Sequence, residues 1–258
     1  TVVSRALRGM AVLAAGLAVS AAMAQPKPLR ILVGFPPGGG TDAIARILGE
    51  KLQPELGQPV VVENKPGAGT IIGTDMVAKA APDGYTLLIS SGTTFTVNPA
   101  VRPKLPYDPV KSFEPIGITG RTGLILLANK DVPVADVKQF VAALKAAPEK
   151  YSYGSFGAGT TSQFAGEMFF HAAGVKIQHV PYKGSAPSVG AVLGGEVQFT
   201  MDTLLITKPL IEPERAPSKM FAPKLGNWAT MPAMMISETP LPMPRLVICS
   251  PSQRRNIV

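Results

Sequence analysis

The chain has 258 residues, of which 46% are hydrophobic and 16% charged. This composition supports a buried core and excludes a disordered chain or a multi-span membrane protein. Of the net charge of +8, two charges fall in residues 1–24 and four in residues 213–258, which leaves +2 for residues 25–212. We therefore expect no basic face and no nucleic-acid partner. One Cys and two His exclude an internal disulfide and predict no metal and no cofactor.

The first 24 residues have the pattern of an export signal. Arg5 and Arg8 precede an apolar run from Met10 to Ala22, and Ala22-Met23-Ala24 forms a cleavage signal of the A-x-A type. The apolar run is shorter than the roughly 20 residues that a membrane span needs. We predict a cleaved signal peptide over residues 1–24, with an N-terminal anchor as the alternative.

Residues 25–120 alternate between strand and helix patterns and predict a first lobe. The apolar stretch Leu29–Phe35 reads as a strand, followed by the loop Pro36–Gly40 and a helix that opens at Thr41 and Asp42. Further on, the pattern predicts a strand at residues 60–62, a helix after the Gly-rich residues 67–69, and a strand over residues 85–89. The proline-rich residues 99–115 predict no regular element.

Residues 121–212 begin a second run of the same kind and predict a second lobe. Strands are predicted at residues 124–128, 152–156, 175–180 and 197–201, after one at residues 116–118 that ends the first lobe, and helices at 162–173, 188–193 and after Asp136, which can cap a helix start. Strands that alternate with helices favour an α/β fold with parallel sheets.

The character of the sequence changes after Glu212. Residues 213–258 hold eight prolines, five of the ten methionines and one glycine, and neither a period of 2 nor one of 3.6 runs through them. We expect an irregular tail, with a frameshift in the reading frame as its favoured origin.

Three junctions between a strand and a helix are candidate binding loops. The first is the loop with Gly38, Gly39 and Gly40, where glycines permit positive φ and close approach of a ligand, and where the helix start favours an anion. It matches neither the P-loop nor G-x-G-x-x-G. The second is Ser90–Thr96 and the third Gly157–Ser162, both rich in hydroxyls that can bind a carboxylate. The alternative for each is an ordinary capped turn.

Few residues are candidates for chemistry. Asp202 follows a strand and can accept hydrogen bonds from a ligand amine or hydroxyl, or can serve only in a turn. His171 and His179 read as structural. Neither a G-x-S-x-G elbow nor a Ser/His/Asp set is present, so the sequence does not predict an enzyme.

Taken together, several stretches resemble the Bug family, the periplasmic substrate-binding proteins of tripartite tricarboxylate transporters. They span residues 28–212 and read LRILVGFPPGGGTDAIAR, ENKPGAGTIIGTDMVAKAAPDGYTLLISSGTT, LPYDPVKSFEPIG, YGSFGAGTTSQFAGEMF and HVPYKGSAPSVGAVLGGEVQFTMD. The resemblance implies a two-lobed α/β "Venus flytrap" fold, a periplasmic location, a monomer, a small organic carboxylate as ligand and a membrane permease as partner. The ligand-binding positions that it implies are Phe35, Pro36, Gly39, Thr41, Asp42, Ser90, Ser91, Thr93, Gly157, Ala158, Thr160, Thr161 and Asp202.

One departure from the family leaves alternatives open. Its members continue in further strand–helix units that complete the second lobe and return to the first, and no such pattern follows Glu212 here. Without a returning strand, the first lobe would expose a sheet edge, and the chain would be marginal or non-functional. The alternatives to a receptor are a secreted α/β enzyme that acts on a carboxylated substrate and a truncated remnant without function.

Overall fold

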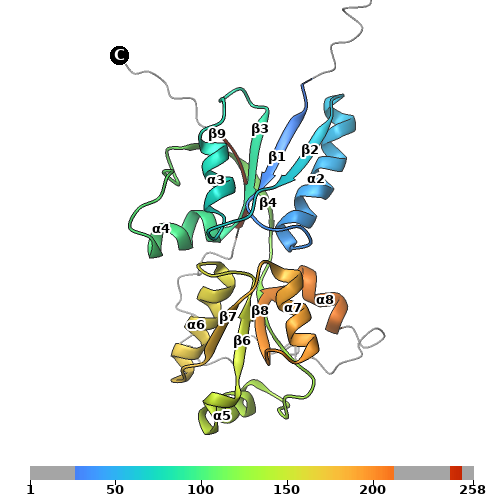
Figure 1. The fold of residues 1–258 in the computed structure, drawn as a ribbon. Helices are drawn as coiled ribbons and strands as arrows, with labels where there is room; N and C mark the ends of the chain where they lie inside the picture. The colour runs from blue at the N-terminus through green and yellow to red at the C-terminus, as the bar shows by residue number, and fades with distance from the viewer. Residues whose placement is uncertain (1–26, 212–244, 252–258) are drawn as a thin grey trace, which may run out of the picture.

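The computed structural model describes residues 27–211 and 245–251. The predicted signal peptide and most of the predicted tail lie outside these residues. The described chain forms two sheets, each with its own helices, stacked end to end (Figure 1). We call the first sheet with α2, α3 and α4 the first lobe, and the second sheet with α5, α6, α7 and α8 the second lobe.

The first sheet has five strands in the order β2-β1-β3-β9-β4. Its strands are β1 (Leu29–Val33), β2 (Val60–Asn64), β3 (Thr86–Ser90), β4 (Phe113–Arg121) and β9 (Arg245–Pro251), and its helices are α2 (Gly40–Leu56), α3 (Ile71–Ala78) and α4 (Asn98–Val101), with a π-helical turn η1 (Thr93–Val97) before α4. β1 runs parallel to β2 and β3. Alternate residues of β1 face opposite layers, so that Ile31 packs toward α2 and Leu32 toward α3.

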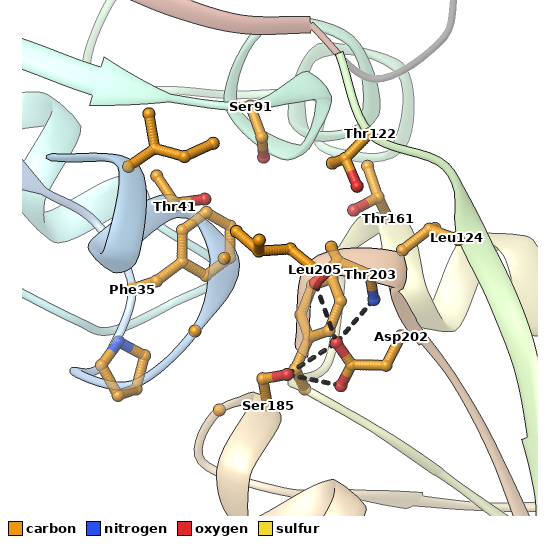
Figure 2. A pocket seen from close by; sticks show the side chains of 16 residues that line it. Phe35, Thr41, Ser91, Thr122, Leu124, Thr161, Ser185, Asp202, Thr203 and Leu205 are labelled. Carbon is orange, nitrogen blue, oxygen red and sulfur yellow. Dashed lines mark hydrogen bonds between the residues drawn. The ribbon is translucent and has the colours of Figure 1, made fainter. Parts of the chain in front are cut away.

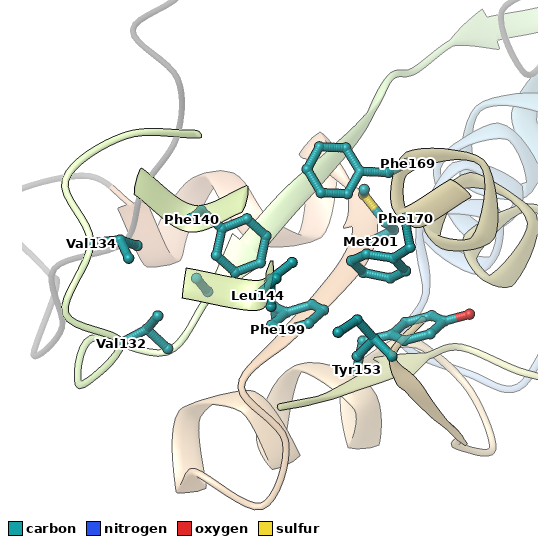
Figure 3. Packing of buried hydrophobic residues seen from close by; sticks show 11 residues of the cluster. Val132, Val134, Phe140, Leu144, Tyr153, Phe169, Phe170, Phe199 and Met201 are labelled. Carbon is teal, nitrogen blue, oxygen red and sulfur yellow. The ribbon is translucent and has the colours of Figure 1, made fainter. Parts of the chain in front are cut away.

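The second sheet has four strands in the order β5-β8-β6-β7. Its strands are β5 (Leu124–Ala128), β6 (Ser152–Ser155), β7 (Gln178–Pro181) and β8 (Phe199–Thr203), and its helices are α5 (Val137–Ala146), α6 (Thr161–Ala173), α7 (Ser185–Gly194) and α8 (Leu204–Ile211), with a 3₁₀ turn η2 at Pro148–Lys150. One face packs against α5 and α6 through an aromatic core (Figure 3). Phe140 meets Phe199 edge to face in this core, with ring centroids 5.0 Å apart. The other face packs against α7 and α8.

The sheets are mixed rather than fully parallel, which corrects one expectation from the sequence. β6 is parallel to β7 and β8, but β5 is antiparallel to β8. β5 and β8 are far apart in the sequence, and β4 enters β5 through Thr122 and Gly123 alone, so the direction of β5 depends on how the chain crosses between the lobes. Strand and helix alternation does not encode that crossing.

A strand forms within the stretch that the sequence predicts to be irregular. β9 lies between β3 and β4 and runs antiparallel to both, so that in the described structure β3 has partners on both sides. The residues Leu246-Val247-Ile248 make a short apolar run with two β-branched members, Val247 and Ile248, which fits a central strand. Because prolines flank this short run, no regular alternation of apolar and polar residues marks it as a strand.

Candidate functional site

The two lobes face each other across a cavity with a free volume of about 50 Å³. Residues of both lobes line it, as Figure 2 shows. From the first lobe and the connection they are Phe35, Pro36, Gly39, Gly40, Thr41, Ile44, Ser91 and Thr122; from the second lobe they are Leu124, Phe156, Thr161, Gly184, Ser185, Asp202, Thr203 and Leu205. A single water molecule needs at least 10–15 Å³ of such volume, so the cavity has room for only a few.

Four helices begin at this cavity. α2 starts at Gly40, α6 at Thr161, α7 at Ser185 and α8 at Leu204, next to Thr203 and Leu205. The first turn of a helix presents free N–H groups and the positive end of the helix dipole. None of the described lining residues is Lys, Arg or His. An anion in this site would therefore meet neutral hydrogen-bond donors and helix dipoles in place of a charged side chain.

The three glycines of the first loop have different roles, which refines the expectation that all of them permit positive φ. Only Gly38 has a left-handed conformation, with φ of +83°. Gly39 is extended, with φ of −91°. A Cβ on Gly40 would lie 3.1 Å from Oγ1 of Thr203 in the second lobe. Gly40 thus allows the lobes to approach each other, and Gly38 turns the chain.

Asp42 holds the loop in place and does not line the cavity. Its carboxylate accepts hydrogen bonds from the backbone N–H of Gly38 (2.9 Å), from Nε of Arg46 (3.0 Å) and from Nδ2 of Asn64 (2.9 Å). Burial opposes ionisation of Asp42, but the hydrogen bonds from Arg46, Gly38 and Asn64 outweigh it, and the pKa of the carboxyl is lowered. The resemblance implies a ligand contact for Asp42, and the structure gives it a bracing position behind the loop.

Of the second junction, Ser91 lines the cavity and Ser90 does not. Ser90 is fully buried, with its hydroxyl 2.5 Å from that of Thr94. Thr93 connects the lobes: its Oγ1 accepts a hydrogen bond from the backbone N–H of Thr161 (3.0 Å) and donates one to Oγ1 of Thr161 (3.2 Å).

The third junction contributes Thr161 to the cavity, whereas Gly157, Ala158 and Thr160 do not line it. Thr160 donates from its hydroxyl to the carbonyl of Gly157 (2.6 Å), which closes the turn before α6. The carbonyl of Ala158 faces the first lobe at Gly69, where a Cβ would lie 3.2 Å from it. These residues shape the loop and its contact with the other lobe.

Asp202 lies at the end of β8 with its carboxylate among Ser185 and Thr203 (Figure 2). The hydroxyl of Ser185 is 2.6 Å from both carboxylate oxygens, and the backbone N–H of Thr203 donates to Oδ1 at 2.6 Å. Asp202 is fully buried. Burial raises the pKa of this carboxyl against the opposing effect of its hydrogen bonds from Ser185 and Thr203.

Sequence reasoning missed the junction between β7 and α7. Gly184 and Ser185 both line the cavity, and they follow a strand and open a helix as the other three loops do. A Cβ on Gly184 would lie 3.1 Å from Cγ of Pro36, so this loop packs against the first one. The signal was present in the Gly-Ser dipeptide before the apolar helix.

Phe156 is a second residue that sequence reasoning missed. Its ring meets that of Phe35 edge to face, with centroids 5.9 Å apart, and the two rings come from different lobes. Together with Ile44, Leu124 and Leu205 they give the cavity apolar walls around a few polar groups, which is typical of small-molecule sites.

The two histidines do not line the cavity. His179 Nε2 lies 2.7 Å from the hydroxyl of Ser155, and burial lowers the pKa of this histidine. Among the described residues no group of three or more His, Cys, Asp or Glu could hold a metal ion. No helix in the described part of the chain is both long and apolar enough to cross a bilayer.

The model of the tripartite tricarboxylate transporter family receptor, TctC, matches residues 44–217. The chain belongs to this family. BugT of Bordetella pertussis is 38% identical over 202 residues, which are 77% of this chain and 62% of BugT. The chain thus spans less than two thirds of the length of this relative.

Solved structures show the same fold. The periplasmic binding protein BugD is 32% identical with a TM-score of 0.73, covering 87% of this chain and 76% of BugD. Rpa4515 of R. palustris, solved with adipate, is 30% identical with a TM-score of 0.74, covering 88% of this chain and 77% of that one. The architecture of this TctC-family chain is therefore the two-lobed α/β fold of periplasmic binding proteins.

Proposed function

We propose that this TctC-family chain is an extracytoplasmic receptor that binds a small organic carboxylate between its lobes and delivers it to the permease of a tripartite transporter. The observation that supports this function best is the convergence of four helix starts on one cavity without a cationic side chain among its described lining residues. Backbone N–H groups and hydroxyls can hold a carboxylate in such a place.

The relatives support the class of ligand and the compartment. Rpa4515 was solved with adipate, a dicarboxylate, and BugD is a periplasmic binding protein. We extend both properties to this chain. We further propose that residues 1–24 are a signal peptide that is removed on export to the periplasm, and that the receptor acts as a monomer.

Lobe movement follows from the position of the cavity. The cavity lies between the lobes, and residues of both lobes line it. We infer that the lobes separate to admit the ligand, and a ligand that contacts both lobes shifts the population toward the closed arrangement. Phe35 with Phe156 and Thr93 with Thr161 are among the contacts that opening would break.

The proposed function can be tested by isothermal titration of the purified chain with di- and tricarboxylates, acidic amino acids and nicotinate-like acids. We expect saturable binding of at least one carboxylate without turnover of the ligand. The variant Thr161→Arg tests the position of the site. It places a bulky cation in the cavity wall, and we expect it to weaken or abolish carboxylate binding. Absence of binding by every acid, from protein that unfolds cooperatively, would contradict the receptor function.

A further inference from the structure

The cavity has two chemically different ends. At one end lie the hydroxyl side chains Thr41, Ser91 and Thr161 (Figure 2), with the start of α6 at Thr161. At the other end lie Asp202 and Ser185 (Figure 2), where α7 begins at Ser185 and α8 at Leu204, and where the start of α2 at Gly40 approaches Thr203. Both ends supply hydrogen-bond donors, and the second also presents a carboxylate, which accepts hydrogen bonds when it is ionised.

Asp202 has only neutral partners. Its described hydrogen bonds come from the hydroxyl of Ser185 and from the backbone N–H and hydroxyl of Thr203. Within the described chain no Lys, Arg or His lies within ion-pair distance of it, whereas the buried Asp42 has Arg46. A buried carboxylate without a cation is costly, and buried charges in proteins are normally paired.

The acceptor capacity of Asp202 is also incompletely used. Oδ2 shares the single hydroxyl hydrogen of Ser185 with Oδ1, and no other described donor reaches it. A carboxylate oxygen can accept about two hydrogen bonds. A ligand group that donates hydrogen bonds and bears positive charge would meet both the vacant acceptor position and the unpaired charge.

We propose that Asp202 is the subsite for a ligand ammonium group, so that the ligand is an amino-substituted carboxylate whose carboxylate lies at the hydroxyl end of the cavity. This inference rests on the proposed function and narrows it to one class of acid. If Asp202 served only to tie α7 to β8 through Ser185, an amino group on the ligand would bring no advantage.

The test compares pairs of acids that differ only in the amino group: succinate with aspartate, adipate with 2-aminoadipate, and butyrate with 4-aminobutyrate. Calorimetry on the wild-type chain should show that, in at least one pair, the amino member binds about tenfold more tightly or better, as expected of a charge-assisted hydrogen bond. Asp202→Asn, which retains an acceptor for the N–H of Thr203, should reduce that preference to less than about threefold. The matched control Asp131→Asn, at an exposed carboxylate, should keep it.

The outcomes separate this inference from the function on which it rests. Equal or tighter binding of the unsubstituted acids by the wild-type chain would overturn the ammonium subsite and leave the receptor function standing, and this comparison needs no variant. An unchanged amino preference in a folded Asp202→Asn protein would overturn it as well. Failure of every acid to bind would overturn both.

Discussion

At the scale of single residues, the two buried aspartates near the cavity differ in their partners. Asp42 has the cation Arg46 beside it and lies behind the binding loop, whereas Asp202 has neutral donors and faces the cavity. The pKa of the Asp42 carboxyl is therefore lowered, and the pKa of the Asp202 carboxyl is raised. The first residue braces the loop, and the second is the one for which we propose a ligand contact.

We predict that Asp42→Asn lowers the free energy of unfolding by about 1–3 kcal/mol at neutral pH, because it weakens charge-assisted hydrogen bonds to a buried carboxylate. The folded-state pKa of Asp42 lies below its unfolded value of about 3.9. The stabilisation is thus complete above that value and is lost as the pH falls through the folded pKa.

Urea denaturation of both proteins at pH 7 and at pH 3 measures this difference, which should shrink in acid. Asp83→Asn is the control, because Asp83 forms an exposed ion pair with Lys27 and should change stability little. A difference between wild type and Asp42→Asn that is larger at pH 3 than at pH 7 would contradict the assignment.

At the scale of elements, the site is made of junctions at which a strand ends and a helix begins. The sequence predicted three of these junctions from glycines and hydroxyls, and the structure brings Thr41, Ser91 and Thr161 together at one cavity. It predicted the start of α5 as well: Asp136 caps that helix and accepts from the N–H of Gln139 at 2.8 Å. A helix cap or a glycine turn depends on residues a few positions apart, so it can be predicted directly from the sequence.

Other features depend on contacts between distant segments and could not be predicted in this way. Whether Asp42 faces the ligand or Arg46, and whether Ser90 or Ser91 reaches the cavity, depends on the orientation of a loop against its neighbours. α8 escaped prediction because its short sequence contains Pro209, a residue that normally argues against a helix interior. β9 depends on partners more than 120 residues away.

Alanine substitutions in the first loop should separate the roles of its three glycines. Gly38→Ala should lower the free energy of unfolding by about 1–2 kcal/mol, because φ is +83° there. Gly39→Ala should have an effect within about 0.5 kcal/mol, because its conformation is extended and a Cβ would lie 3.7 Å from Cβ of Ser185. Gly40→Ala should instead weaken ligand binding, because its Cβ meets Thr203 of the other lobe.

Chemical denaturation and calorimetry on the three variants measure stability and affinity side by side. Gly39→Ala serves as the stability control for Gly38→Ala. Equal destabilisation by all three substitutions would contradict the distinct roles.

At the scale of the whole molecule, the lobes contact each other through a few groups that surround the cavity. Thr93 and Thr161 make two hydrogen bonds between the lobes, and Phe35 and Phe156 make an aromatic contact. Because these contacts join the two lobes, we expect them to favour the closed arrangement over an open one without changing either lobe.

We predict that Thr93→Val increases the open population and weakens carboxylate binding roughly 2- to 10-fold, since it removes two hydrogen bonds of ordinary strength. Small-angle scattering of the ligand-free chain should show a larger radius of gyration, and calorimetry should show the lower affinity. Thr96→Val is the control on the same turn, because Thr96 is exposed. Unchanged scattering and affinity in Thr93→Val would show that these bonds do not favour closure.

The position of β9 leads to a prediction for the first lobe. Ile248 pairs with Ile89 on one side and with Gly117 on the other. Ile248→Pro removes a backbone donor from a central strand, and we expect the free energy of unfolding to fall by about 3 kcal/mol or more. Urea denaturation followed by circular dichroism measures this change. A midpoint equal to that of the wild type would show that β9 does not stabilise the sheet.

The same strand sets an order of events for folding. All pairings of the second sheet lie within residues 124–203, whereas the first sheet needs residues 245–251 between β3 and β4. The second lobe can therefore form from segments close together in sequence, and the first must wait for a closure across more than 150 residues, which is slow. The lobe that starts the chain is thus the one completed last, so that the emerging first lobe keeps an open sheet edge while the second is already formed.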